Sequence, residues 1–300
     1  MSTAQNFIRE NKTKTYLIMV FFVLFIGMVG FILSKGLGYG NVFLFPALAI
    51  SLIASLISYY YGDKLILKVS GAQEADPRQY PELFQIVKSL SQKENIPPPA
   101  IYICPEKAPN AFATGRDPNH ASICVTYGLL HMMSKQETEG VLAHELSHVK
   151  NFDTRLMMIL SVLVGLVAFL SDWFIRSIIW GGRKQDNDKG GGTVLLLAGI
   201  IFAILSPIVA TLIQLAVSRN REYLADADGA VFTEHPDALA SALTKIAGDI
   251  KPMEHASNAT AHLYFTNPFK GKEATIWFSS LFNTHPPIEN RIKILKEMSI

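Results

Sequence analysis

Four long apolar runs stand out when hydrophobic and polar positions are followed along the chain. They extend from Tyr16 to Ser34, from Val42 to Tyr61, from Leu156 to about Trp180 and from Thr193 to Val217. Each approaches the roughly 20 residues that an α-helix needs to cross about 30 Å of hydrocarbon. The pattern therefore predicts about four transmembrane helices. The third is the weakest candidate, because Asp172 and Arg176 follow an uncharged part that spans only about 24 Å.

Shorter patterns in the polar segments predict helices and a small sheet. Apolar residues recur at the spacing of one helical face in "PELFQIVKSL". The runs "AIYIC" and "HASICVTYGLL" are rich in strand-forming residues, and "APNAFATGRDPN" between them is typical of a turn. Ser134, with Glu137 three residues later, predicts the start of a helix through "VLAHELSHVKNFD". Further helices are expected from about Ser218 to Thr233, from Asp237 to Ile250 and from Ile288 to Met298.

Composition and charge support a membrane protein and indicate its orientation. Apolar residues make up 49% of the 300 residues and charged residues only 17%. The net charge is +2 and no basic tail or arm is present, which argues against a nucleic-acid-binding protein. Arg9, Lys12 and Lys14 precede the first run, so the positive-inside rule places the N-terminus and both polar segments in the cytoplasm. The basic connection "GGRKQDNDKGGG" opposes this orientation, because it falls on the expected outer side.

Only two cysteines occur, Cys104 and Cys124, and neither lies at metal-binding spacing. We expect buried, reduced thiols that pack as small apolar side chains. The alternative is a disulfide between neighbouring strands, which would require an oxidising compartment.

The motif "HELSH" is the first candidate metal-binding feature of the chain. A helix advances about 100° per residue, so His144 and His148 emerge on one face and can bind one Zn²⁺. Glu145 lies beside them as the candidate general base for a water that zinc acidifies. The other interpretation is a solvated helix face on which two histidines occur by chance.

A third ligand is available 74 residues downstream in "SRNREYLADADGA". Helical spacing places Glu222 and Asp226 on one face, so Glu222 can complete the site and Asp226 can accept a hydrogen bond from the outer nitrogen of a ligand histidine. Two histidines, one acid and one open position are typical of a catalytic zinc site. A charged surface helix is the alternative for this segment.

Four blocks in a fixed order carry a resemblance to a known family. They are "PNAFATGRDPNHASICVTYGLL", "EGVLAHELSHVKNFD", "SRNREYLADADGA" and "THPPIENRI". With these blocks set between hydrophobic hairpins, the chain resembles the HtpX-type membrane zinc metalloproteases, a prokaryotic branch of the family that includes the CAAX prenyl proteases. The resemblance implies one Zn²⁺ per subunit held by His144, His148 and Glu222, with Glu145 as general base and Asp226 as the orienting acid.

Other site residues follow from the resemblance with alternatives left open. Asn110, Ala111 and Phe112 would form a substrate-binding edge strand that pairs with an extended peptide, or else a turn that leads into a hairpin. His285 would stabilise the oxyanion of the tetrahedral intermediate, or else only shape the loop before two prolines. Arg291 would brace nearby carboxylates.

The expected fold is an α+β membrane protein with a zincin-like catalytic domain assembled from two chain segments. Residues 1–68 would form an N-terminal transmembrane hairpin, and residues 69–155 the first half of the catalytic domain with the HExxH helix. Residues 156–217 would form a second hairpin, and residues 218–300 the second half with the glutamate ligand. Straight helices would hold the metal about 10 Å from the hydrocarbon edge, which favours substrates near the bilayer.

The sequence thus predicts an integral membrane zinc endopeptidase of a prokaryotic inner membrane. Its partners would be protein or peptide substrates and the lipid bilayer, and its expected role is quality control of membrane or misfolded proteins, often linked to stress. Two rival hypotheses stay open. One is a prenyl-protein processing protease, whose relatives carry more spans, and the other is a membrane scaffold that binds zinc without cutting.

Overall fold

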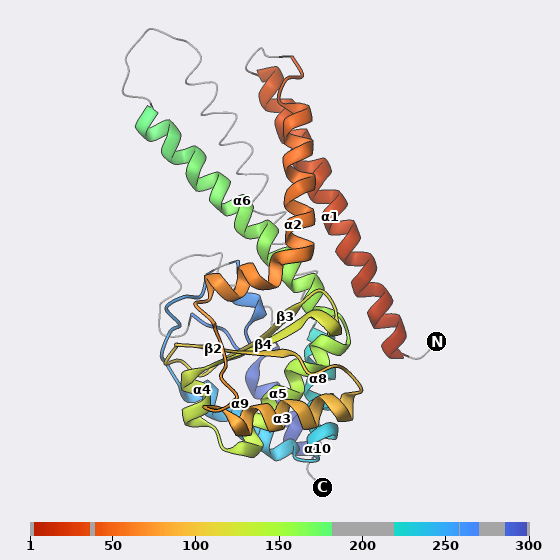
Figure 1. Ribbon diagram of the computed structural model, residues 1–300, viewed down its shortest axis with the longest axis vertical. Coiled ribbons are helices and arrows are strands. Elements are labelled where there is room, and N and C mark those ends of the chain that lie inside the picture. The colour runs from red at the N-terminus through yellow and green to blue at the C-terminus, as the bar shows by residue number, and fades with distance from the viewer. Residues whose placement is uncertain (1–2, 37–39, 182–218, 258, 270–285, 299–300) are drawn as a thin grey trace.

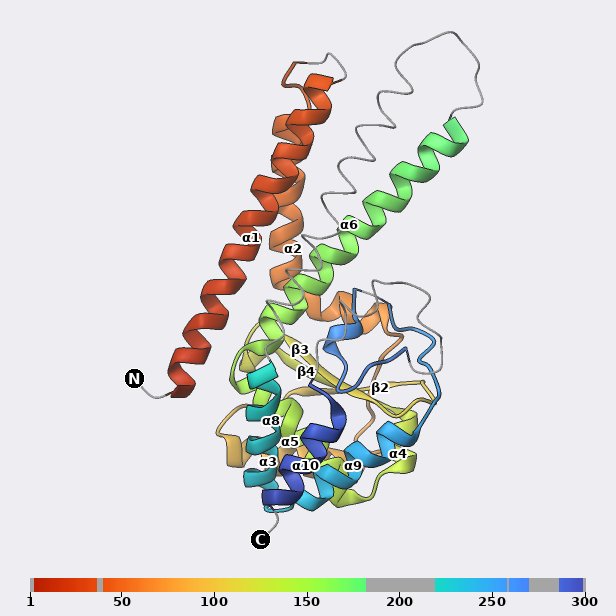
Figure 2. The ribbon, with the colours of Figure 1, turned by 180° about the vertical axis from the view of Figure 1, so that it is seen from behind.

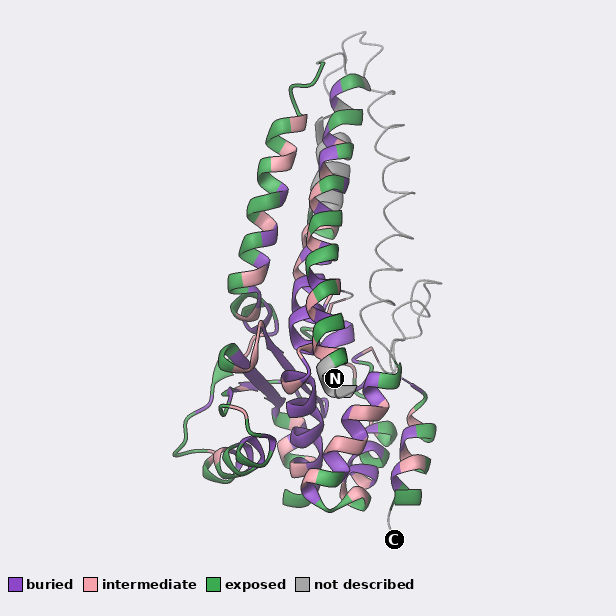
Figure 3. Ribbon diagram, turned by 90° about the vertical axis from the view of Figure 1, so that its right-hand side faces the viewer, coloured by how far each residue is buried: buried purple, intermediate pink, exposed green. Residues whose placement is uncertain are grey.

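Long helices rise from one end of a mixed α/β body in the computed structural model, which describes residues 3–36, 40–181, 219–257, 259–269 and 286–298 (Figure 1). These helices are α1 (Thr3–Gly36), α2 (Leu44–Val69) and α6 (Asp153–Gly181). Figure 3 shows many exposed residues along the outer parts of α1 and α2 and buried residues in the body below. The exposed side chains of α1 and α2 include many large apolar ones, as expected for surfaces that face lipid.

Two of the described helices are long and apolar enough to cross a membrane by themselves. They cover Asn6–Ile32 within α1 and Leu44–Val69, and a third candidate is the bent pair Lys135–Lys150 and Asp153–Phe169. The predicted fourth run, from Thr193 to Val217, lies outside the described residues. The side chains of Asp172 and Arg176 lie outside them as well. The prediction of an α+β membrane protein is confirmed in its coarser part, an α-rich fold with candidate membrane helices, and the number of spans stays a prediction.

A four-stranded sheet forms the centre of the body, with the order β1-β2-β4-β3. Its strands are β1 (Gln73–Glu74), β2 (Ala100–Cys104), β3 (Ala111–Gly115) and β4 (Ala121–Thr126), and β2 and β4 run parallel while the other pairs are antiparallel. The prediction of a turn over "APNAFATGRDPN" was wrong for its centre, because pairing with β4 makes residues 111–115 a strand. Gly115 ends this strand with φ +137°, where a Cβ would meet the His120 carbonyl oxygen at 2.2 Å.

The two faces of the sheet belong to different cores. Successive side chains of a strand point to opposite faces, and β4 follows this rule: Ile123 and Val125 join one buried cluster and Cys124 joins the other. The first cluster includes the helices of the body. The second includes Ile66 of α2 and Met158 of α6, and both of these helices contact β3, whereas α1 packs mainly on α2 and α6. Cys104 and Cys124 are both free and buried, as expected.

The helices of the body cover the first face of the sheet (Figure 2). They are α3 (Pro81–Glu94), α4 (Tyr127–Met132), α5 (Lys135–Lys150), α8 (Arg219–Thr233), α9 (Pro236–Gly248) and α10 (Ile288–Met298). The short 3-10 turns η1 (Pro118–His120) and η2 (Ala261–Leu263) complete the described elements. Helix α5 is the central one and packs against β3, α3, α8 and α9. Its position explains why residues 140–149 are all buried.

Both ends of α5 are sharply defined. Ser134 accepts a hydrogen bond from the Glu137 amide while the Glu137 side chain accepts one from the Ser134 amide, which is the predicted capping box. At the other end Asn151 caps the helix and Phe152 adopts a left-handed φ of +60°. The chain then turns by 82° into α6. The premise that the ligand helix runs straight into the third span was therefore wrong, because the left-handed residue breaks the helical path.

Candidate metal centre

Three buried side chains from two distant parts of the sequence converge between α5 and α8. His144 and His148 come from α5 and Glu222 from the first turn of α8. The two Nε2 atoms are 3.1 Å apart, and Glu222 oxygens lie 3.4 Å from Nε2 of His148 and 3.9 Å from Nε2 of His144. One ligand atom from each residue falls within 4.8 Å of the others. A single metal ion fits between such atoms.

Each histidine is oriented by a carboxylate on its outer nitrogen. Asp226 lies 2.9 Å from Nδ1 of His144, and Asp153 lies 2.9 Å from Nδ1 of His148. Arg291 holds Asp226 in a bidentate pair, with Nε 2.7 Å from Oδ2 and Nη2 2.6 Å from Oδ1. These outer contacts leave both Nε2 atoms directed at the same point. The geometry is that of carboxylate–histidine pairs around metals.

The electrostatics of the group favour a bound cation. Burial lowers the pKa of His144 to about 4 despite its hydrogen bond with Asp226, so this ring is neutral and able to act as a ligand near neutral pH. Burial also opposes protonation of His148, but the hydrogen bond with Asp153 and the charge of Glu222 raise its pKa to about 9. The carboxylates that favour a proton on this ring favour a metal cation for the same reason.

The donor set fits zinc. Two imidazole nitrogens and one carboxylate oxygen are a common protein contribution to a catalytic zinc site, which keeps a further position for water or substrate. Glu145 follows His144 on α5 and is also buried, and its charge contributes to the raised pKa of His148. It therefore lies near the ligands, where the general-base hypothesis requires it.

Sequence reasoning assigned no role to two residues that shape this centre. Asp153 follows the bend after α5, and only the left-handed Phe152 brings its carboxylate back to His148. Phe265 places its ring 4.9 Å from that of His144 and 4.8 Å from the guanidinium carbon of Arg291. Spacing along the sequence predicts neither contact. The contact of Asp153 with His148 depends on the turn at Phe152, and Phe265 lies in a loop more than a hundred residues after His144.

The predicted substrate-binding strand is an edge of the sheet. Ala111 and Phe112 lie in β3, which pairs with β4 on one side, and Asn110 precedes them. On the other side the Phe265 amide donates to the Ala111 carbonyl over 2.8 Å, and the Asn110 side chain donates to the Thr266 carbonyl over 3.0 Å. The chain itself thus occupies the start of this edge. His285 lies outside the described residues.

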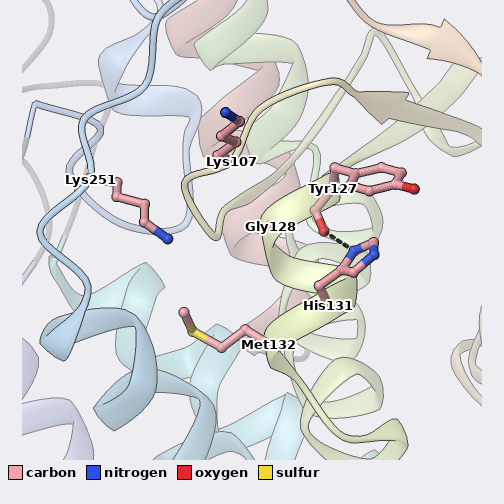
Figure 4. A pocket seen from close by; sticks show the side chains of 6 residues that line it. All are labelled: Lys107, Tyr127, Gly128, His131, Met132 and Lys251. Atoms are coloured by element: carbon pink, nitrogen blue, oxygen red, sulfur yellow. Dashed lines mark hydrogen bonds between the residues drawn. The ribbon is translucent and has the colours of Figure 1, made fainter.

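A separate surface pocket of about 400 Å³ lies near α4 (Figure 4). It is lined by Lys107, Tyr127, Gly128, His131, Met132 and Lys251. Nδ1 of His131 donates a hydrogen bond to the Tyr127 carbonyl over 2.8 Å. None of these residues belongs to the His144, His148 and Glu222 group, so the pocket is not the metal centre.

Comparison with known protein families identifies the family to which this metal centre belongs. Residues 77–299 match the family described as "Peptidase family M48". The chain belongs to peptidase family M48. The matched range includes α5, α8 and α10, and therefore all three members of the candidate metal centre.

Relatives of the M48 family resemble the chain over nearly its full length. Proteins named "Protease HtpX homolog" share 44% identity in Caldanaerobacter subterraneus subsp. tengcongensis, covering 97% of this chain and 96% of the relative. The relative from Tropheryma whipplei is 43% identical, and the match covers 98% of each chain. The relative from Lactobacillus helveticus is 44% identical, and the match covers 97% of this chain and 98% of the relative. The predictions of the HtpX-type family, of a metallopeptidase and of a membrane zinc protease are confirmed by these matches.

One solved structure has a similar fold. The crystal structure of S. mikatae Ste24p matches with a TM-score of 0.52 at 17% identity, covering 96% of this chain. The chain spans 66% of the length of that protein. This likeness concerns the fold alone.

Proposed function

We propose that the chain is a multi-pass inner-membrane endopeptidase in which His144, His148 and Glu222 hold one Zn²⁺ and Glu145 is the general base. The observation that carries the proposal is the convergence of these ligand atoms within 4.8 Å, in a member of peptidase family M48. Bound zinc would supply the Lewis acidity that polarises a peptide carbonyl and acidifies a water molecule.

Glu145 takes a proton from the attacking water and later delivers it to the leaving amine. Its place beside His144 on the rigid, buried α5 keeps the carboxylate at a constant distance from the ligands. Asp226 and Asp153 keep the two imidazoles in the orientation that exposes Nε2. Arg291 fixes Asp226 and keeps a positive charge near the site, 3.8 Å from Glu222. His285 would assist the developing oxyanion.

The substrates we propose are membrane-associated or misfolded proteins, as part of membrane protein quality control. Support comes from the position of the metal centre, because α5 leads through a single bend into the apolar α6. An extended peptide would pair with the edge of β3 at Asn110, Ala111 and Phe112, once the contacts of residues 265–266 with this edge are released. The catalytic domain, built from residues 69–155 and 218–300, would face the cytoplasm.

The decisive experiment compares Glu145→Gln with the wild type, both purified in detergent. We expect Glu145→Gln to keep one zinc per chain and to cleave casein about 10²- to 10⁴-fold more slowly, because only the general base is lost. Zinc is measured by atomic absorption and cleavage by release of fluorescent peptides. Glu139→Gln, on the same helix, is the matched control and should cut normally.

Two results would refute the proposal. A wild-type chain with its full zinc content that cuts no protein or peptide would favour a non-catalytic scaffold. A Glu145→Gln variant that cuts at the wild-type rate would remove the general-base assignment.

A further inference from the structure

A polar residue of the first membrane helix lies inside the metal centre's supporting network. Asn11 is on α1, five positions before the apolar run that begins at Tyr16, and it is only 1% exposed. It therefore faces the body of the protein rather than lipid or water. A buried amide requires partners for both its donor and its acceptor atoms.

The partners of Asn11 lie at the bend between α5 and α6. Its Nδ2 donates to Oδ1 of Asp153 over 2.6 Å and to the carbonyl of Asn151 over 2.9 Å. The first bond fixes the carboxylate whose other oxygen, Oδ2, is 2.9 Å from Nδ1 of His148. The second fixes the cap that ends the ligand helix. Asn11 thus contacts Asp153, and Asp153 contacts the ring of the candidate ligand His148.

The other side of the amide reaches the second ligand helix. Oδ1 of Asn11 accepts a hydrogen bond from Nη1 of Arg221, the residue immediately before Glu222 on α8. Nε of Arg221 also lies 3.4 Å from Oδ1 of Asp153. One side chain of α1 therefore joins the end of α5 to the start of α8, the two helices that must converge to form the site.

An amide suits this position for a physical reason. The side chain of Asp153 is buried, so its oxygens need hydrogen-bond donors, while the neighbouring guanidinium of Arg221 needs acceptors. Asparagine supplies one of each without adding a charge. An apolar residue would leave the second oxygen of Asp153 with the arginine alone, and Asp153 could then rotate away from His148.

We propose that Asn11 is a positioning residue of the metal centre, so that the first membrane helix is an integral part of the zinc site rather than only an anchor. It acts through Asp153 on His148, and its contact with Arg221 keeps that guanidinium beside the same carboxylate. The residues matched by the peptidase family begin at 77 and leave this contribution out. The inference rests on the proposed function for the identity of the metal.

The test measures zinc affinity in Asn11→Leu, which keeps the approximate side-chain size but removes both hydrogen-bonding groups. We expect zinc to bind about 10- to 100-fold more weakly, the usual cost of losing an outer contact to a metal site. Affinity is measured on the metal-free full-length chain in detergent by competition with a chromophoric chelator. Asn6→Leu is the matched control, because Asn6 is exposed on the same helix, and it should bind zinc as the wild type does.

A double-mutant cycle with Asp153→Asn separates positioning from a general loss of stability. If Asn11 acts through Asp153, the double variant should bind zinc no more weakly than Asp153→Asn alone. The d–d absorption of the Co²⁺-substituted Asn11→Leu variant should also shift, because the geometry at His148 changes. In a cleavage assay kcat should fall more than KM rises. If Asn11→Leu does not fold, Asn11→Ser, which admits a water molecule, replaces it in every measurement.

Wild-type zinc affinity and Co²⁺ absorption in a folded Asn11→Leu variant would overturn the inference, and so would losses that multiply in the double variant. These outcomes are separate from failure of the proposed function. A wild type that binds zinc but never cuts would refute the endopeptidase, while the zinc affinities of the variants would still decide the role of Asn11.

Discussion

Each histidine of the candidate metal centre has its own carboxylate, and the two carboxylates are held in different ways. Asp226 is paired with Arg291 through two short contacts, whereas Asp153 depends on Asn11 and Arg221. Such contacts restrict the rotation of an imidazole and set which nitrogen is free to bind. At the scale of single residues the precision of the site therefore depends on groups that never touch the metal.

Replacing Asp226 tests this dependence. We expect Asp226→Asn to bind zinc about 10- to 100-fold more weakly, because His144 loses its negatively charged partner and Arg291 loses the charge of its bidentate partner. Asp228→Asn is the control with the same change of charge on the same helix, since Asp228 contacts Ser147 rather than a histidine. Chelator competition measures both. Equal affinities for the two variants would contradict the orienting role of Asp226.

At the scale of elements, α5 is stabilised by its first turn and by its enclosure. The side chain of Glu137 accepts from the Ser134 amide, from Ser241 over 2.6 Å and from Lys245 over 2.6 Å, so the capping box also connects α5 to α9. Burial alone would raise the pKa of Glu137, but these hydrogen bonds lower it from 4.5 to about 2. The beginning of the ligand helix is therefore held by an ionised carboxylate.

This shift predicts a pH-dependent stability. A carboxyl whose pKa is lower in the folded state stabilises the fold above its unfolded pKa of 4.5, and the contribution is lost as the pH falls toward about 2. We expect Glu137→Gln to unfold at a lower temperature than the wild type at neutral pH. The difference should shrink as the pH falls through that window, as followed by thermal unfolding in detergent. A difference that stays constant with pH would contradict the assignment, and Glu139→Gln serves as the control.

At the scale of the whole molecule, the sheet joins the membrane helices to the catalytic helices. One face packs on α5 and its neighbours, and the other packs on α2 and α6, which in turn contact α1. The two cores share the strands of the sheet. The membrane helices and the catalytic helices therefore pack on opposite faces of the same sheet.

The proposed orientation is tested with single added cysteines. Asn41→Cys lies in the exposed connection between α1 and α2, and Gln136→Cys is exposed at the start of α5. We expect a membrane-impermeant maleimide to label Asn41→Cys in intact cells and Gln136→Cys only after permeabilisation. The native thiols should not react, because both are buried. The opposite labelling pattern would place the catalytic domain outside the cytoplasm.

The sequence by itself determined the local features of this protein. Apolar length predicted α1 and α2, helical periodicity predicted α3, and the capping signal at Ser134 predicted the start of α5. The spacing of His144 and His148 required only a helix, and Glu222 with Asp226 required another. Each of these features is set by residues within a few turns of one another, where spacing along the chain fixes spacing in space.

Only the tertiary structure decided which distant groups meet. The strand β3 exists because β4 pairs with it, although its own residues are typical of a turn. Asp153 reaches His148 because Phe152 takes a left-handed conformation, and Asn11 and Arg221 reach Asp153 because α1 and α8 pack beside that bend. Contacts of this kind arise from the burial of whole elements against one another. No local pattern of residues encodes them, because their energy comes from packing and hydrogen bonds across the chain.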